Sequence, residues 1–264
     1  MDHRIEYLGT ELYYRTYGTG QPLFFIHGFG EDGRVFENQV NEFESSYRVI
    51  VPDLPGSGQS EFNHDINSME SYAACITAIL DLEKTPAAVI IGHSMGGYIT
   101  LAMAEKFAAR VLSFGLFHSS ALPDDEEKKK SRKKSIKFIE EKGARIFMEE
   151  FLPKLFSERF KKEHQAVIDH LIARYANFDP RSLVQYTKAM MQRPDRTIIL
   201  KEWLKPVLMI IGEEDTAIPL QGSLQQTHLP KLSYIHIGRE TGHMGMFEDP
   251  AGCNKIIRAF LDNL

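Results

Sequence analysis

The sequence has little cysteine or tryptophan, no excess of positive charge and no long apolar run. Only two of its 264 residues are cysteine and one is tryptophan. Cys75 and Cys253 cannot form a disulfide framework, and their apolar, helix-like surroundings predict buried thiols. The formal net charge of -5 does not favour nucleic-acid binding, which requires a basic face.

Two further absences bear on location. No stretch of the sequence is long and apolar enough to span a bilayer. The N-terminal segment lacks the basic region and apolar run of a secretory signal. We therefore expect a soluble, cytoplasmic protein without a membrane span. The length and the 43% of hydrophobic residues suit one large α/β domain.

Short apolar runs rich in Val, Ile and Phe alternate with helical patterns along most of the chain. The predicted strands cover residues 5–7, 12–17, 22–26, 47–51, 87–91, 111–117, 206–211 and 233–237. The first two read as a hairpin, and the others are typical of strands buried on both faces. Asn67 and Glu70 resemble a capping box that opens a helix to about Leu82, and residues 94–108 read as another helix. This alternation predicts a parallel sheet with right-handed crossovers.

The alternation is interrupted between residues 123 and 203, where no convincing strand occurs. A helix over 133–143 is expected to stop at Gly143, and residues 161–177 carry one apolar stripe at helical spacing. Asp179 and Pro180 start a further helix. We therefore predict a helical cap at 123–203, inserted into a core made of residues 1–122 and 204–264.

The segment with the clearest chemistry is Gly92-His93-Ser94-Met95-Gly96, directly after a strand and before a helix. It has the G-x-S-x-G pattern of a nucleophile elbow in its required context. A strained turn raises the Ser94 hydroxyl above the sheet, and only glycine fits two residues before and after it. The Met95 N–H, at the positive end of the helix, can donate to a developing oxyanion.

Two loops after other strands can complete such a site. In His27-Gly28-Phe29-Gly30 the glycines let the backbone turn, so the Phe29 N–H is the natural second oxyanion donor. Glu213, Glu214 and Asp215 follow a later strand, and one of them could orient a histidine base. His243 lies in the loop between the last strand and the last helix.

Together these segments resemble the α/β-hydrolase family, whose chain order of nucleophile, acid and base is that of Ser94, Asp215 and His243. The resemblance implies a mostly parallel eight-stranded sheet flanked by helices, with a helical cap after the sixth strand. It also covers the turn Asp53-Leu54-Pro55-Gly56-Ser57-Gly58, which we interpret as structural, and Glu248-x-Pro250 after the histidine. Among the three acids, the resemblance selects Asp215, four residues before Pro219. Some family members place the acid after the strand ending near Phe117, where Asp124 or Asp125 could serve.

These groups predict a serine hydrolase that cleaves a carboxylic ester of small to medium acyl chain through an acyl-enzyme. The expected partner is a small-molecule acyl substrate, and no metal or organic cofactor is expected. The candidate substrate-binding residues are Phe29, His93, Phe147, Met148 and Met190. For the cap residues, packing within the cap is the preferred interpretation. His93 is interpreted as a packing residue of the elbow that could contact bound substrate.

Other functions fit the same residues. C–C bond hydrolysis, thioester hydrolysis or a lyase reaction could use the same serine, histidine and aspartate, because proteins with one fold can catalyse different reactions. A cation facing a substrate carboxylate would favour the C–C or lyase reaction, and Arg34 is one candidate. A receptor with slow turnover is a third hypothesis. The basic run from Lys128 to Lys134 is interpreted as a solvated helix face rather than a site for an anionic substrate.

Overall fold

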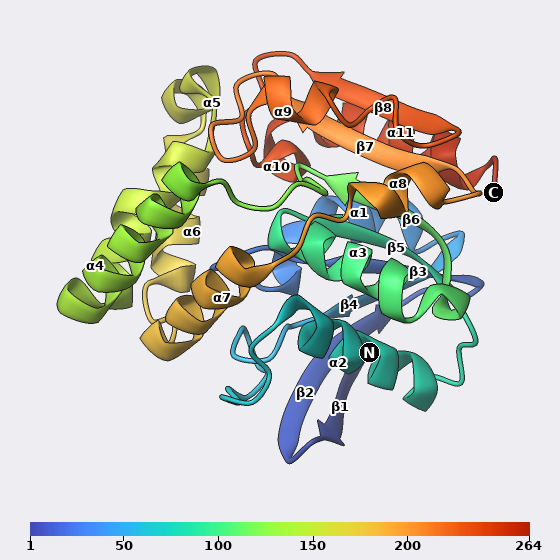
Figure 1. Ribbon diagram of the computed structural model, residues 1–264, viewed down its shortest axis with the longest axis horizontal. Coiled ribbons are helices and arrows are strands. Elements are labelled where there is room, and N and C mark those ends of the chain that lie inside the picture. The colour runs from blue at the N-terminus through green and yellow to red at the C-terminus, as the bar shows by residue number, and fades with distance from the viewer.

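A central eight-stranded sheet with helices on both faces forms the body of the protein, in a computed structural model that describes residues 1–264 (Figure 1). The strands are β1 (Asp2–Tyr7), β2 (Thr10–Tyr17), β3 (Gln21–Ile26), β4 (Tyr47–Pro52), β5 (Ala88–His93), β6 (Val111–Phe117), β7 (Val207–Gly212) and β8 (Ser233–Gly238). Their order across the sheet is β1-β2-β4-β3-β5-β6-β7-β8. The β1–β2 hairpin joins β4 antiparallel, and β3 to β8 are parallel. The predicted mostly parallel sheet is confirmed.

The helices fall into two groups by position in the chain. Those outside the segment between β6 and β7 are α1 (Glu37–Phe43), α2 (Met69–Leu82), α3 (Met95–Lys106), α9 (Leu220–Leu224), α10 (Gly245–Glu248) and α11 (Pro250–Leu261). Those between β6 and β7 are α4 (Glu126–Phe151), α5 (Glu158–Glu163), α6 (Gln165–Tyr175), α7 (Pro180–Gln192) and α8 (Thr197–Glu202). None of the helices has the length and apolar character needed to cross a membrane.

The core has two layers because successive strand residues point to opposite faces of the sheet. Phe24 and Ile90 pack with residues of α2 and α3 on one face. Phe25 and Ile91 pack with residues of α1 and α11 on the other. Burial on both faces explains why these strands are continuous apolar runs. Both cysteines are buried and free, as predicted.

Two predicted helix boundaries were wrong. The capping box of α2 is formed by Ser68 and Ser71, whose side chains exchange hydrogen bonds with each other's backbone. Glu70 instead pairs with Arg196. The helix expected over 133–143 begins earlier, at Glu126, whereas Gly143 does interrupt it: its φ of 82° and ψ of 169° are not helical, and a second helical stretch follows to Phe151. Its charged N-terminal half has high helix propensity, so the helix extends further than its apolar pattern indicated.

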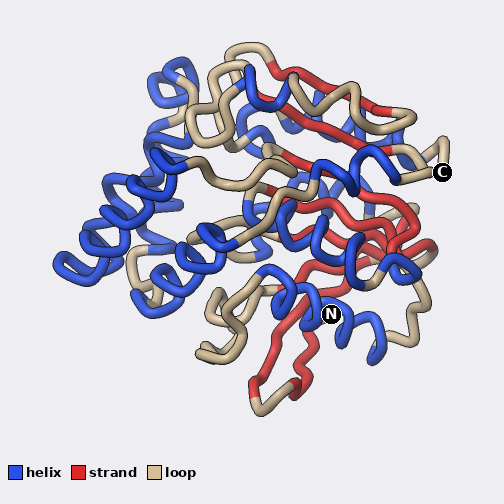
Figure 2. The backbone as a smooth tube through the Cα atoms, viewed as in Figure 1, coloured by secondary structure: helices blue, strands red, loops and turns tan.

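The helices α4 to α7 stand away from the sheet at one end of the strands (Figures 1 and 2). α4 packs against both α6 and α7, whereas α8 packs against α3 beside the sheet. We call α4 to α7 the cap helices. They lie after the sixth strand, where an insertion was expected; the division of the chain at residues 123 and 203 remains a prediction.

Candidate active site

Ser94 occupies a strained turn between β5 and α3. Its φ of 51° lies in the left-handed region, which costs about 1–3 kcal/mol for a residue other than glycine. A Cβ on Gly92 would lie 2.2 Å from the Gly96 carbonyl oxygen, and one on Gly96 would lie 2.1 Å from the Ile26 carbonyl oxygen. The Ser94 N–H donates to the Phe117 carbonyl at 2.9 Å, which ties the turn to β6. The elbow therefore requires glycine on both sides of the serine.

A cavity of about 600 Å³ opens above this turn, between the carboxyl ends of the strands and the cap helices. Ser94 and His243 both line it. Of the predicted substrate-binding residues, Phe29, Phe147 and Met190 line the cavity, whereas His93 and Met148 do not. Both of these are fully buried.

The two predicted oxyanion donors, the N–H groups of Phe29 and Met95, belong to two segments that adjoin Ser94. A Cβ on Gly28 would lie 3.0 Å from the Ser94 Cβ, so the Gly28–Phe29 backbone passes directly beside the serine. The Gly28 N–H donates to Glu31 at 2.8 Å. The Phe29 and Met95 N–H groups have no acceptor within the protein. They remain available to a substrate oxygen at this position.

Asp215 and His243 are in direct contact. His243 Nδ1 lies 2.7 Å from Asp215 Oδ2, while Asp215 Oδ1 accepts from the Ala217 and Ile218 N–H groups at 2.8 Å each. No hydrogen bond joins the Ser94 hydroxyl to His243 in this structure, although both face one cavity. Glu213 and Glu214 are exposed. Among the three acids after β7, only Asp215 contacts the histidine.

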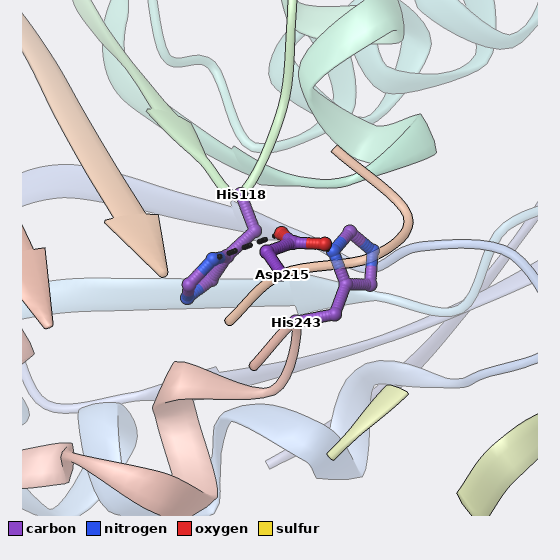
Figure 3. Close-up of side chains that lie close together, drawn as sticks. All are labelled: His118, Asp215 and His243. Atoms are coloured by element: carbon purple, nitrogen blue, oxygen red, sulfur yellow. Dashed lines mark hydrogen bonds and ion pairs between the residues drawn. The ribbon is translucent and has the colours of Figure 1, made fainter. Parts of the chain in front are cut away.

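A second histidine, His118, contacts the same carboxylate from the end of β6 (Figure 3). His118 Nδ1 lies 3.3 Å from Asp215 Oδ2, and the Gly245 N–H donates to His118 Nε2 at 3.2 Å. Since Nε2 accepts a hydrogen bond, the neutral ring carries its proton on Nδ1 and directs it toward Asp215. Sequence reasoning missed this residue, because a histidine at the end of a buried strand carries no motif.

The electrostatics of this group keep Asp215 charged. Burial alone would raise the pKa of Asp215, but His243 and His118 together hold it below the ordinary value of 3.8. Burial lowers the pKa of His118 to about 4, against the opposing effect of Asp215. His118 is therefore neutral at ordinary pH, with its Nδ1 facing the Asp215 carboxylate at 3.3 Å. One nitrogen or oxygen atom from each of His118, Asp215 and His243 lies within 4.8 Å of the other two, which is close enough to hold a metal ion. In this structure the histidine nitrogens instead face the Asp215 carboxylate.

The loop that carries His243 is held by Glu248. The Glu248 carboxylate accepts from the N–H groups of Gly242 and Met244, on either side of the histidine. It also accepts from the Ser157 N–H at 2.9 Å, and the His243 N–H donates to the Leu155 carbonyl at 2.7 Å. The acidic residue of the Glu248-x-Pro250 pattern therefore supports the histidine loop.

His93 forms a buried pair with Glu31 beneath the elbow. His93 Nδ1 lies 3.0 Å from Glu31 Oε2, and His93 Nε2 lies 2.9 Å from the His243 carbonyl oxygen. Burial opposes the charge on each group, but their mutual attraction lowers the pKa of Glu31 and raises that of His93. Both ring nitrogens of His93 are occupied, so it braces the elbow and the histidine loop and is not part of the cavity wall.

Asp124, the alternative acid, belongs to a different network. It is buried and accepts from Arg132 and from Arg193, the latter at 2.7 Å. Asp125 caps α4 by accepting from the Lys128 N–H at 2.7 Å. Neither residue contacts His243, so the structure gives no support to an acid after β6. Arg34, the candidate cation near the oxyanion loop, pairs with Asp32 and does not line the cavity.

The basic run from Lys128 to Lys134 is only partly a solvated helix face. Lys130, Lys133 and Lys134 are exposed, as that interpretation requires. Lys128 and Arg132, one helical turn apart, instead line the cavity. Charge patterning in the sequence could not reveal this, because the run contains cations on every side of the helix.

Comparison with known proteins finds several hydrolases that are similar to this chain. Residues 21–166 match the family described as alpha/beta hydrolase fold. The chain is 24% identical to a 2-hydroxy-6-oxo-2,4-heptadienoate hydrolase of Pseudomonas putida, covering 96% of this chain and 93% of that protein. It is 27% identical to a pimeloyl-[acyl-carrier protein] methyl ester esterase of Vibrio cholerae, with coverages of 93% and 96%. A solved structure of a thermophilic esterase from Thermogutta terrifontis, with malate bound, superposes with a TM-score of 0.92 at 28% identity, covering 99% of this chain and 98% of the other. The chain therefore belongs to the α/β-hydrolase fold family.

Proposed function

We propose that this hydrolase cleaves carboxylic esters of small to medium acyl chain, with Ser94 as nucleophile, His243 as base and Asp215 as the acid that orients the base. The observation that carries the proposal is the 2.7 Å contact between His243 and Asp215 beside a cavity that also contains Ser94 on its strained turn. The similarity to an esterase over nearly the whole chain supports it.

The chemistry follows from the positions of these groups. His243 Nε2 takes the Ser94 proton as the serine oxygen attacks the ester carbonyl, and the negative charge on the carbonyl oxygen is stabilised by the Phe29 and Met95 N–H groups. The protonated histidine then gives its proton to the departing alcohol, which leaves an acyl-Ser94 ester. Water deprotonated by His243 attacks that ester and releases the carboxylic acid and Ser94. Asp215 stays ionised and stabilises the imidazolium in both steps.

The size of the cavity favours small to medium substrates. About 600 Å³ is within the usual range for sites that bury a small molecule. Phe29, Phe147, Phe151 and Met190 supply its apolar part. These side chains come from both the oxyanion loop and the cap helices, so the acyl chain would lie between them.

The test is steady-state hydrolysis of p-nitrophenyl esters, from acetate to a long chain, by the wild type and by Ser94→Ala. Turnover that depends on Ser94 and peaks at one chain length is the expected result. Absence of Ser94-dependent turnover on every ester would reject the esterase proposal. The acid assignment is tested in parallel, because Asp215→Asn should abolish most activity and Asp124→Asn should not.

A second candidate is hydrolysis of a carbon–carbon bond next to a ketone. The relative named 2-hydroxy-6-oxo-2,4-heptadienoate hydrolase favours it, since that name describes an oxo acid rather than an ester. Assaying a vinylogous diketone acid beside the ester series separates the two reactions, because a C–C hydrolase of this kind should cleave the diketone acid far faster than any p-nitrophenyl ester.

A further inference from the structure

Three cationic side chains of the cap region line the cavity that contains Ser94. They are Lys128 and Arg132 of α4, and Arg193 directly after α7. On α4, Lys128, Ser131, Arg132 and Ser135 all line the cavity, and their spacing places them on one face of the helix. A polar, cationic stripe therefore faces the interior of the site.

The charges of this group are not balanced within the protein. The buried carboxylate of Asp124 pairs with both Arg132 and Arg193, so one anion serves two guanidinium groups. The Nε of Arg193 is buried without a hydrogen-bond acceptor. The Lys128 ammonium donates to the neutral Ala217 carbonyl at 2.7 Å and pairs with no carboxylate.

The carboxylates on the cavity wall do not compensate. Glu31 is paired with His93, and Asp125 is engaged at the N-terminus of α4. Once Glu31 is set aside because His93 offsets its charge, Asp124 and Asp125 remain as two carboxylates against the three cations. A partly buried excess of positive charge favours a bound anion.

We propose that the cavity holds a substrate whose acyl chain carries a carboxylate, bound by Arg132 and Lys128 while the scissile carbonyl lies at Ser94. The planar guanidinium of Arg132 suits a carboxylate, with which it can form two parallel hydrogen bonds. Phe147, Phe151 and Met190 would cover the chain between the two polar ends. This inference rests on the proposed function for its reaction, but not for its binding step.

The experiment compares two esters with the same six-carbon acyl chain, mono-p-nitrophenyl adipate and p-nitrophenyl hexanoate. We expect kcat/KM about tenfold higher for the adipate ester in the wild type, the size of a charge-assisted hydrogen bond. Arg132→Gln should remove that preference, because kcat/KM should fall about tenfold more for the adipate ester than for the hexanoate ester. Lys133→Gln is the matched control, because Lys133 lies on the same helix but is exposed and outside the cavity.

A binding measurement keeps the two proposals separate. Adipate itself is titrated calorimetrically into Ser94→Ala, and into Ser94→Ala combined with Arg132→Gln or with Lys128→Gln. Binding that each added substitution weakens about tenfold supports the carboxylate site, even if no ester is hydrolysed and the proposed function is wrong. If the Arg132 variant fails to fold, the Lys128 variant still tests whether the cavity binds a carboxylate.

The opposite pattern would overturn the inference. Equal kcat/KM for the two esters, or a preference for hexanoate that Arg132→Gln leaves unchanged, would show that the cations serve only to hold the cap helices. Absence of adipate binding by Ser94→Ala would lead to the same conclusion, while Ser94-dependent hydrolysis of hexanoate would leave the proposed function intact.

Discussion

The sheet-side wall of the cavity is shaped by backbone turns, whereas the cap-side wall is shaped by side chains on two helices. On the sheet side, Gly92 and Gly96 allow contacts that no Cβ could make, and Ser94 accepts a left-handed φ. On the cap side, Gly143 also has a positive φ, but an added Cβ there would meet nothing within 4 Å. An added side chain would therefore clash at the elbow, whereas at Gly143 only the backbone conformation disfavours one.

The difference separates two kinds of function. A reacting serine, a base and an oxyanion site must be placed within a fraction of an ångström, and backbone turns give that precision. Selection among substrates needs only a suitable surface, which Phe147, Met190 and Arg132 would provide under our proposal, since they line the cavity from α4 and α7. Substitutions on the sheet side should therefore reduce kcat, and those on the cap side should change KM and substrate preference.

The largest expected effect is loss of the reacting groups. Ser94→Ala and His243→Ala should each lower kcat by about 10⁴-fold or more, and the double variant should lose no more than the worse single one. The measurement is steady-state hydrolysis of the best p-nitrophenyl ester. A cap-side control, Met190→Ala, should change kcat by less than about tenfold. Comparable losses in the control would break the distinction between the walls.

The next effect comes from crowding the elbow. Gly96→Ala forces a Cβ against the Ile26 carbonyl, so we expect a loss of at least about 3 kcal/mol of unfolding free energy and most of kcat. Gly143→Ala meets no atom and should cost about 1–3 kcal/mol, because its φ of 82° and ψ of 169° are readily adopted only by glycine, with kcat retained. Urea unfolding and ester hydrolysis measure both. Equal destabilisation of the two variants would contradict the proposed rigidity of the sheet side.

A smaller effect is expected at His118, a positioning residue that acts through Asp215. His118→Phe removes the ring nitrogen that faces the Asp215 carboxylate at 3.3 Å, so kcat should fall about tenfold with little change in KM. Replacement by another donor, His118→Asn, should restore part of kcat, since asparagine also accepts a positive φ.

The same residue should leave a signature in the pH dependence of stability. The pKa of His118 is about 4 in the fold and 6.5 as the ordinary value, so the unfolded chain binds the proton first. Stability should therefore fall as pH decreases from 6.5 toward 4, by up to about 3 kcal/mol, and His118→Phe should lack this decrement. Asp215 has a lowered pKa, so its own contribution is lost only below about pH 4. His93 has a raised pKa, and its contribution is lost above pH 6.5. If the stability of the wild type and that of His118→Phe change with pH in the same way, His118 is not held neutral in the folded protein.

The smallest expected change in kcat follows from Asp124→Asn. Two guanidinium groups lose their shared carboxylate, which should cost about 3 kcal/mol of stability or more. Hydrolysis of a short neutral ester, measured below the unfolding temperature, should keep kcat within about threefold. A loss as large as that of Asp215→Asn would make Asp124 part of the reacting group.

The two walls also differ in how far the sequence could predict them. Gly92, Ser94 and Gly96 follow a buried strand at a spacing that only one turn explains, so the elbow and the strands of the sheet could be located in advance. His118 could not, and the Glu248-x-Pro250 pattern did not reveal the bond from Ser157 to Glu248, since both contacts join segments far apart in the chain. Gly143 was expected to end a helix and does interrupt it, but a second helical stretch continues in the same element. Lys128 and Arg132 line the cavity because of the way α4 packs on the rest of the protein. A local sequence pattern cannot predict that packing.

The hydrogen bonds around Glu248 have a mechanical consequence. The segment just after α4 holds the histidine loop twice, through Ser157 to Glu248 and through Leu155 to the His243 backbone. A displacement of that segment would carry the base away from Asp215, so this corner has to stay in place during turnover. The half of α4 before the kink at Gly143, which carries Lys128 and Arg132, makes no hydrogen bond to the histidine loop. A substitution in that half should therefore leave the contact between His243 and Asp215 undisturbed.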